Sequence, residues 1–154
     1  MNTYHITVGT YGTRLHGGTA PTVERPRNLL GDEFVGLDPD RERYVRDKMV
    51  QSPVYLTKEQ RFYIESTAPD ICVRGKWEYH LLGCQEDHFH LLLSGDAEPK
   101  KIRHWFKFWM TQALNGKYEK RTWFVECGST KWINDEDYFN AVYEYIRRQR
   151  ITPE

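Results

Sequence analysis

The fold of this chain follows from seven residues near its middle, His88-Phe89-His90-Leu91-Leu92-Leu93-Ser94. Apart from the two histidines and the final serine, the run is strongly apolar. Because side chains alternate between the two faces of a strand, His88 and His90 share one face, whereas Phe89 points into the opposite layer with Leu91 and Leu93. The run therefore predicts a packed strand that presents two imidazoles from one face.

Neighbouring runs supply the other strands. The apolar run Trp77 to Cys84 is separated from the histidine strand by the turn-like Gln85-Glu86-Asp87, which predicts an antiparallel hairpin. Alternation in residues 4–8 predicts a first strand. Two short strands are expected late in the chain, near residues 122–126 and 131–133.

Two helices are predicted before the hairpin. Asp38-Pro39 resembles an N-cap followed by a proline at the first helical position, and this helix extends to about Val50. The second helix follows the capping box Thr57-Lys58-Glu59-Gln60 and is expected to end near Pro69.

Two more helices follow the hairpin. Between Pro99 and Asn115 apolar residues recur at the i, i+3, i+4, i+7 spacing of an amphipathic helix, with Gly116 as a C-cap. The last helix begins after Asn134, and its acidic first turn and arginine-rich end complement the helix dipole.

This order of elements predicts an α+β fold, a ferredoxin-like or RRM-like antiparallel sheet with flanking helices and a C-terminal helix that carries Tyr145. A length of 154 residues suits a single domain, residues 1–154. Residues 19–37 contain prolines and glycines without helix or strand periodicity, and they are predicted to be a mobile loop insertion.

Composition sets limits on the class of protein. The chain is 39% apolar and 29% charged, which is enough apolar surface for a core and too little for a membrane protein. No secretory signal is recognisable at the start, so a cytoplasmic location is expected. Three widely spaced cysteines fit neither a disulfide framework nor a Cys-x-x-Cys zinc site, and they are expected to be reduced core residues.

Charge is unevenly distributed. The 22 Lys+Arg balance the 22 Asp+Glu, a balance that by itself argues against a nucleic-acid partner. However, residues 99–131 contain eight Lys/Arg against two acids, whereas residues 32–47 contain six acids against three arginines. The average therefore hides a basic segment.

Two places could carry chemistry. His88 and His90 on one strand face form half of a divalent-metal site, although two half-exposed histidines at a hairpin end would look the same. In the last helix Tyr145 and Gln149 are four residues apart and share one face, and Tyr145 could equally be a core aromatic. The carboxamide of Gln149 needs a partner, for which a metal ion or its water would serve.

Taken in order, these motifs resemble the HUH single-tyrosine transposases, including their REP-associated relatives. The resemblance rests on three motifs: the His-x-His strand after Arg74-Gly75-Lys76-Trp77, the Pro-x-x-Ile-x-x-x-x-Lys motif that starts the next helix and has its lysine at Lys107, and the terminal Tyr-x-x-x-Gln. The segments Thr10-Tyr11-Gly12-Thr13-x-Leu15-x-Gly17 and Leu56-Thr57-x-Glu59-Gln60-Arg61 are also similar. The similarity covers nearly the whole chain apart from residues 19–37.

The resemblance implies cleavage and strand transfer of single-stranded DNA, at sites that bear a hairpin. His88, His90 and Gln149 would hold Mg²⁺ or Mn²⁺ against the scissile phosphate. Tyr145 would be the nucleophile and would form a 5′-phosphotyrosine, so that no nucleotide cofactor is needed. Four basic residues are expected to contact the DNA backbone, namely Lys107, Arg103, Arg147 and Arg148.

Alternatives remain at this stage. Tyr143 is a second candidate nucleophile, and a homodimer could complete each site with the partner's last helix. A domesticated protein that binds DNA or RNA hairpins without strand transfer is the other functional class. Two weaker alternatives involve zinc. One is a structural zinc site, in which the hairpin places the Cys84 thiolate across from His88. The other is a small zinc hydrolase.

Overall fold

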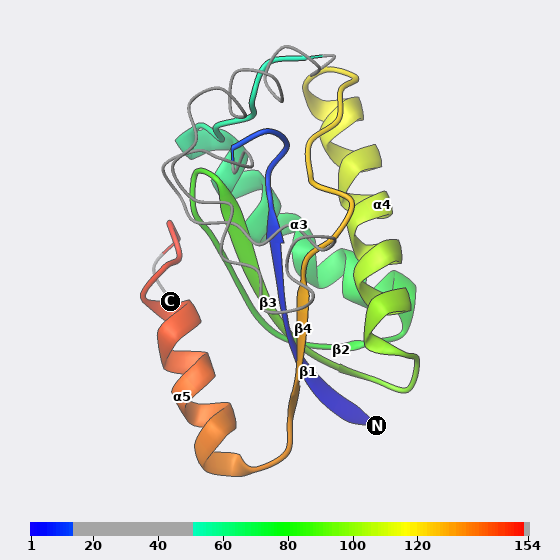
Figure 1. The fold of residues 1–154 in the computed structure, drawn as a ribbon, viewed down its shortest axis with the longest axis vertical. Helices are drawn as coiled ribbons and strands as arrows, with labels where there is room; N and C mark the ends of the chain where they lie inside the picture. The colour runs from blue at the N-terminus through cyan, green and yellow to red at the C-terminus, as the bar shows by residue number, and fades with distance from the viewer. Residues whose placement is uncertain (14–50, 153–154) are drawn as a thin grey trace, which may run out of the picture. The chain divides into compact units, whose positions relative to one another are not determined.

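The computed structural model describes residues 1–13 and 51–152, and Figure 1 shows their arrangement. The predicted helix of residues 38–50 and the predicted loop of residues 19–37 lie outside the described residues. The chain forms two compact units, one of Met1–Thr10 with Tyr55–Glu154 and the other of Tyr11–Val54. The elements of the first unit are β1 (Asn2–Gly9), α3 (Lys58–Gly75), β2 (Glu78–Cys84), β3 (His88–Gly95), α4 (Pro99–Lys117), β4 (Ser129–Ile133) and α5 (Glu136–Arg147).

Within the described residues, the strands form one four-stranded sheet in the order β2-β3-β1-β4. Every neighbouring pair is antiparallel, and β3 and β1 occupy the centre. This order, with α3 between β1 and β2 and α4 between β3 and β4, is the ferredoxin-like arrangement. The predicted fold class is therefore confirmed.

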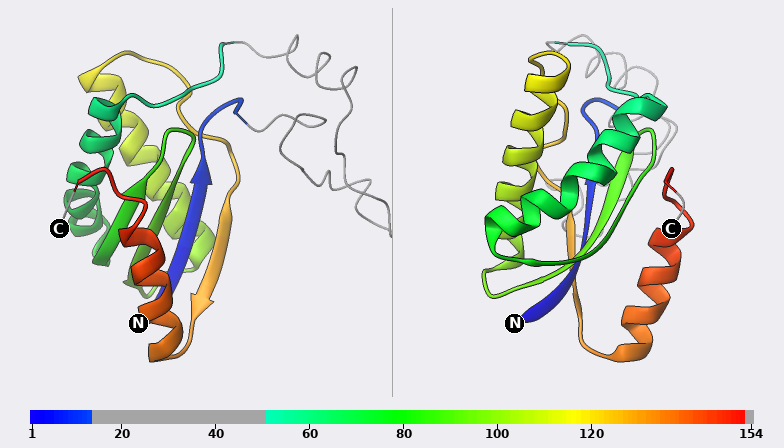
Figure 2. Two further views of the ribbon diagram at one scale, coloured as in Figure 1. Left: turned by 90° about the vertical axis from the view of Figure 1, so that its left-hand side faces the viewer. Right: turned by 180° about the vertical axis from the view of Figure 1, so that it is seen from behind.

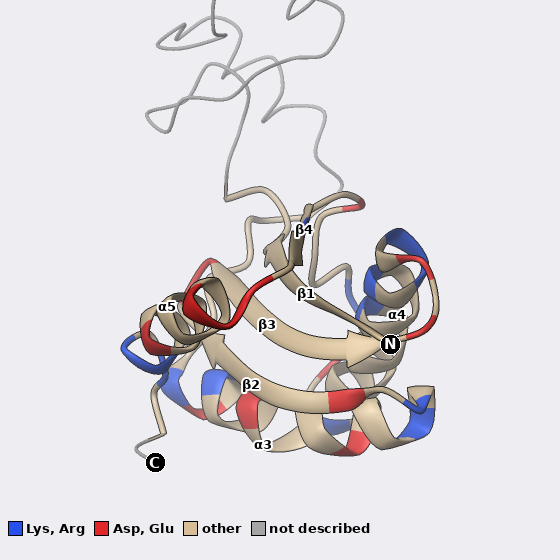
Figure 3. Cartoon of the chain, turned by 90° about the horizontal axis from the view of Figure 1, so that it is seen from below, with Lys and Arg blue, Asp and Glu red and all other residues tan. Residues whose placement is uncertain are grey.

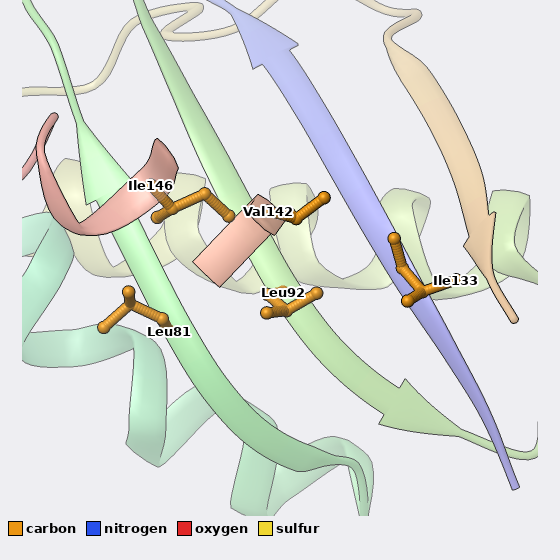
Figure 4. Close-up of a cluster of buried hydrophobic side chains, with 5 residues drawn as sticks. All are labelled: Leu81, Leu92, Ile133, Val142 and Ile146. Carbon is orange, nitrogen blue, oxygen red and sulfur yellow. The ribbon is translucent and has the colours of Figure 1, made fainter. Parts of the chain in front are cut away.

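The sheet is covered on both faces, as Figure 2 shows. On the α3 and α4 side, the Phe89 ring lies 5.6 Å from that of Phe106, between ring centroids. On the other side α5 covers the sheet through a small apolar cluster, drawn in Figure 4. Its members come from three strands and from α5, namely Leu81, Leu92, Ile133, Val142 and Ile146.

Two helix ends differ from the prediction. Helix α3 does not end near Pro69 but continues to Gly75, because Ile71 and Cys72 extend its buried side beyond the proline. A left-handed Lys76 (φ 60°) then closes it, with the Trp77 amide donating to the Cys72 carbonyl at 2.9 Å. Likewise α4 includes Gly116, the predicted C-cap, and ends one residue later at Lys117.

The expected strand at residues 122–126 is wrong. Only a single bridge between Thr10 and Phe124 forms there, with the Val125 amide donating to the Gly9 carbonyl at 3.0 Å. The aromatic residues of this segment are buried for packing rather than for strand pairing, since Trp123 and Phe124 contribute to the core. A short run of aromatic and β-branched residues can therefore indicate either a strand or an irregular connection packed on the core.

Two remaining expectations concern cysteines and membranes. Cys72 and Cys84 are free and buried, as expected of small core residues, whereas Cys127 is exposed. Within residues 1–13 and 51–152, no helix combines the length and the apolar character that crossing a bilayer requires.

Candidate active site

The two histidines of β3 and the tyrosine of α5 meet on the face of the sheet that α5 covers. The His88 and His90 rings lie 4.9 Å apart, edge to face. The Tyr145 ring lies 5.2 Å from the His90 ring, again edge to face. Tyr145 is 49% exposed, so it is not a core aromatic. The fold thus brings the predicted nucleophile next to the predicted ligand pair.

His88 is oriented by its neighbour in sequence. Its Nδ1 lies 2.6 Å from Oδ1 of Asp87, in the turn before β3. An Nδ1–H that donates to a carboxylate leaves Nε2 as the lone-pair site of the imidazole. This carboxylate–histidine pairing is common behind metal-binding histidines.

His90 is held by β1, the adjacent strand. Its Nδ1 lies 3.0 Å from Nε2 of His5 and 3.0 Å from the hydroxyl of Thr7. Its Nε2 is buried and has no hydrogen-bond partner among the described residues. Burial, followed by the charges of His88 and His5, lowers the pKa of His90 to about 3. His90 is therefore neutral at neutral pH, with an unsatisfied buried nitrogen beside Tyr145.

His5 and Thr7 were not identified from the sequence as site residues. Thr7 is the register partner of His90, and His5 is two residues earlier on the same face. Their polar positions alternate with the buried Tyr4, Ile6 and Val8, and this alternation was the available signal. It becomes informative only once β1 is known to pair with β3.

The end of α5 is fixed by a buried carboxylate of α3. Glu65 accepts hydrogen bonds from the backbone amides of Cys84 (3.0 Å), Ile151 (2.9 Å) and Thr152 (3.0 Å). Arg150 lies 3.6 Å from it. Glu65 thereby connects the last residue of β2 to the chain that follows α5. It was not identified from the sequence, because no local pattern around it marks a buried acid.

Gln149 lies just beyond α5 rather than within it, because the helix ends at Arg147. Its amide donates to the Ile146 carbonyl at 2.9 Å, in a turn. Its carbonyl accepts from the side chain of Gln85 at 2.7 Å, which ties this turn to the β2–β3 hairpin. The last helix therefore ends two residues before Gln149, which lies in the turn that follows Tyr145 closely. That the two side chains share one face stays a prediction.

The predicted DNA-contacting residues of α4 are not grouped with the histidines. Lys107 donates to the carbonyls of Val125 (2.5 Å) and Glu126, and burial lowers its pKa. Arg103 donates to the carbonyl of Gly128 at 2.8 Å. Both side chains therefore connect α4 to the segment before β4, on the far side of the sheet from α5. Their contact with phosphate stays a prediction.

The two arginines of the last helix lie at its exposed end. Arg147 forms a two-pronged pair with Glu144, with distances of 3.0 and 2.8 Å. Arg148 lies 3.9 Å from the same carboxylate and is largely exposed. Both are on the same short segment as Tyr145, as the sequence implied, and their contact with DNA also stays a prediction.

Two alternatives lose support. Tyr143 is partly buried against the α5 cluster and stacks on Phe139, whereas Tyr145 contacts His90. Cys84 pairs in register with Phe89 rather than with His88, and its thiol lies 3.4 Å from the Gln85 carbonyl. Because Cys84 and Phe89 share the face opposite to the histidines, the zinc site with a Cys84 ligand is wrong.

The two histidines supply part of the ligand set that a divalent ion needs. Within the described part of the chain, no three residues among His, Cys, Asp and Glu converge on one point. In both His88 and His90 a hydrogen bond at Nδ1 orients the ring and leaves Nε2 available as a ligand. The Nε2 of His90 is buried and has no partner among the described residues. This pair fits an ion that takes its other ligands from an amide, water or a phosphate.

Comparison with known proteins gives a consistent result for the fold. No protein-family model matches the chain, and no curated protein matches it. A REP-associated tyrosine transposase bound to a REP hairpin has a similar structure, with a TM-score of 0.52 and 13% identity over 95% of this chain. The chain spans 64% of the length of that structure.

A second solved structure is a protein of Deinococcus radiodurans whose assignment as a transposase is provisional. It has 13% identity and a TM-score of 0.48, over 97% of this chain and 92% of its own. At 13% identity, the likeness to the REP-associated tyrosine transposase bears on the fold alone. In its fold, the chain is similar to a REP-associated tyrosine transposase, as the resemblance of its motifs implied.

Proposed function

We propose that the chain cleaves single-stranded DNA and transfers the strand, with Tyr145 as the nucleophile. One observation carries the proposal. A half-exposed tyrosine lies against a histidine whose buried Nε2 has no partner among the described residues. Next to it is a second histidine that a carboxylate orients. Buried polar atoms without partners are rare in proteins, and a catalytic role or a bound ion is one of the explanations for them. A nucleophile beside them indicates chemistry rather than packing.

In the proposed reaction the phenolic oxygen of Tyr145 attacks the scissile phosphorus. The new bond is a 5′-phosphotyrosine, the bond to the 3′ oxygen breaks, and the leaving oxygen takes a proton and becomes a free 3′-hydroxyl. The phenol proton passes to solvent. Because the phosphodiester energy is retained in the covalent link, attack by another 3′-hydroxyl reverses the step without a nucleotide cofactor.

The site residues would hold Mg²⁺ or Mn²⁺ through Nε2 of His88 and of His90, with the Gln149 carboxamide as a third donor. When bound, the ion supplies positive charge that offsets the charge developing on the phosphate oxygens. Asp87 orients the imidazole of His88, and His5 and Thr7 orient that of His90. The turn from Arg148 to Gln149 is held by Gln85, which limits the motion of the helix end next to Tyr145.

The proposed substrate is single-stranded DNA that bears a hairpin. Two observations support it, namely the fold shared with a protein solved on a REP hairpin and the basic segment that includes α4. That structure is longer than this chain, so the substrate is proposed here on the shared portion alone.

The test is a covalent-adduct assay. Full-length protein is incubated with 5′- and 3′-labelled hairpin oligonucleotides and Mg²⁺ or Mn²⁺, and the products are separated on a denaturing gel. We expect a protein–DNA adduct that carries the 3′-side label, that chelator abolishes and that Tyr145→Phe lacks. Tyr143→Phe is the matched control, two residues away on the same helix, and should still form the adduct.

Two results would overturn the proposal. An adduct that persists in Tyr145→Phe would place the nucleophile elsewhere. Tight hairpin binding without any adduct, from folded wild-type protein in either metal, would instead indicate a domesticated hairpin-binding protein.

A further inference from the structure

Helix α4 exposes aromatic residues on its outward face. Its buried side is formed by Ile102, Phe106, Met110 and Leu114, at ordinary core spacing. On the outer face, Trp105 is 44% exposed and Phe108 is 46% exposed. An outward helix face is normally polar. The exposed rings therefore need an explanation other than the core of this unit.

The rings form a contiguous surface, which we call the α4 aromatic face and define as His104, Trp105, Phe108 and Trp109. The Trp105 ring lies 5.5 Å from that of Trp109 and 5.7 Å from that of Phe108. The His104 ring lies 5.3 Å from that of Trp105. Arg74 of α3 lies over Trp109, 4.6 Å from the ring centroid. The rings are thus held by one another and by a cation.

A groove runs beside this face. It has a volume of about 380 Å³ and is lined by His104, Phe108 and Thr111 of α4 and by Phe124 and Val125 of the facing segment. It is mainly apolar, and its lining also includes Lys107 and Glu126. A space of this size, with Phe108 and Phe124 in its lining, can admit one flat heterocycle.

The charge of α4 indicates what the face binds. The helix contains five Lys and Arg and no acidic residue. Figure 3 shows basic segments on α4 in blue. By contrast, α5 contains three acids and one arginine. Lys100, Lys101 and Lys117 are exposed, at the two ends of the helix, so the aromatic face lies between positive ends. A hydrophobic protein partner would not need this excess, whereas a polyanion with flat bases would use both features.

We propose that the α4 aromatic face binds unpaired bases of single-stranded DNA. Trp105 and Phe108 stack on the bases, the adjacent groove takes one base, and the lysines at the helix ends contact the phosphates. The choice of DNA rests on the proposed function. The site itself is distinct, since α4 and the His90–Tyr145 pair lie on opposite faces of the sheet.

The test measures binding separately from cleavage. Anisotropy of a fluorescent hairpin oligonucleotide with a single-stranded extension is recorded in chelator, with wild-type protein and with Trp105→Ala and Phe108→Ala. We expect each substitution to weaken binding roughly tenfold, the usual effect of removing one stacking aromatic. Trp105→Phe should restore most of the affinity, because it retains a ring. Intrinsic tryptophan fluorescence should be quenched by the DNA in wild-type protein and less in Trp105→Phe.

The matched control is Trp132→Ala, which removes an exposed tryptophan from β4. It should bind DNA as tightly as the wild-type protein. Equal affinities for wild type, Trp105→Ala and Phe108→Ala would overturn the proposal. So would a loss of self-association in Trp105→Ala, measured by sedimentation, with unchanged DNA affinity, because the face would then be a contact between copies of the chain.

The two proposals can fail independently. Loss of affinity in Trp105→Ala together with absence of any covalent adduct in the wild-type protein would support the α4 site and refute the nucleophile. An adduct that depends on Tyr145, together with unchanged affinity in Trp105→Ala and Phe108→Ala, would do the reverse.

Discussion

Gly83 of β2 lies directly against the backbone of Ile146 in α5. A Cβ atom at position 83 would come within 2.6 Å of the Ile146 carbonyl oxygen, closer than such atoms approach in proteins. Gly83 is also the register partner of His90. Because Gly83 has no side chain, the backbone of Ile146, the residue after Tyr145, can approach the sheet beside His90.

Gly83→Ala should displace α5 and misplace the nucleophile. We expect a loss of about 1–3 kcal/mol in the free energy of unfolding, as for other overpacked sites. Adduct formation should slow by tenfold or more, because a shift of about 1 Å at reacting groups can cost two orders of magnitude. Urea unfolding and single-turnover adduct rates measure the two effects.

Gly116→Ala is the matched control, since a Cβ at that position meets no atom within 4 Å. Within α4 this change should stabilise by about 0.5–1 kcal/mol and leave the adduct rate unchanged. An unimpaired adduct rate in Gly83→Ala would show that close approach of α5 is not needed.

Glu65→Gln should loosen the segment that follows α5. The carboxylate accepts from three backbone amides and lies beside Arg150, and a carboxamide would leave that arginine without its partner charge. Breaking a buried charge pair from one side typically costs about 3–5 kcal/mol. We expect a lower urea midpoint and faster amide hydrogen exchange at Ile151 and Thr152.

The exposed Glu78→Gln is the control for that change and should alter the free energy of unfolding by no more than about 0.5 kcal/mol. Exchange at residues 151–152 that equals the wild-type rate in Glu65→Gln would indicate that other contacts hold the segment.

Much of the fold could be predicted because its signals are local. The capping box at Thr57 and the apolar spacing of α4 define helices without reference to the rest of the chain, and both features are present. The helix end expected at Pro69 was wrong because tertiary burial of Ile71 and Cys72 outweighs the local effect of the proline.

The candidate site was only partly predictable. His88, His90 and Tyr145 belong to short motifs, and the structure brings all three together. His5 and Glu65 act across 85 and 86 residues of sequence, on His90 and Ile151 respectively, so only strand order and helix packing disclose them. Contacts of this separation leave no periodicity that a single sequence can show.

The stability of the metal-free protein should depend on pH through His90. Its folded pKa is about 3, whereas the ordinary value of 6.5 applies to the unfolded chain. Between these values the unfolded chain binds a proton that the folded chain does not, so stability is full above pH 6.5 and declines as the pH falls toward 3. Urea midpoints in chelator at pH 7.5 and pH 4.5 should show this loss.

His90→Gln should show a smaller loss between the two pH values, because the group that resists protonation is gone. His104→Gln changes an exposed histidine of α4 and should retain the wild-type loss. The same pH dependence in wild type and His90→Gln would assign the acid sensitivity to other groups.

His5→Ala should weaken metal binding although His5 is not one of the proposed ligands. Its Nε2 is within hydrogen-bonding distance of Nδ1 of His90, and the partner at Nδ1 determines which nitrogen of His90 carries the lone pair. Loss of such a partner typically reduces metal affinity by about 10–100-fold. Mn²⁺ titration monitored by electron paramagnetic resonance measures the change, and His5→Gln, which can still hydrogen bond there, should recover part of it.

The control is His80→Ala, because the His80 side chain hydrogen bonds to Ser94 and not to His90, so its Mn²⁺ affinity should equal that of the wild-type protein. Equal Mn²⁺ affinities for wild type and His5→Ala would mean that Thr7 alone suffices to orient His90, since its hydroxyl lies at the same 3.0 Å from Nδ1.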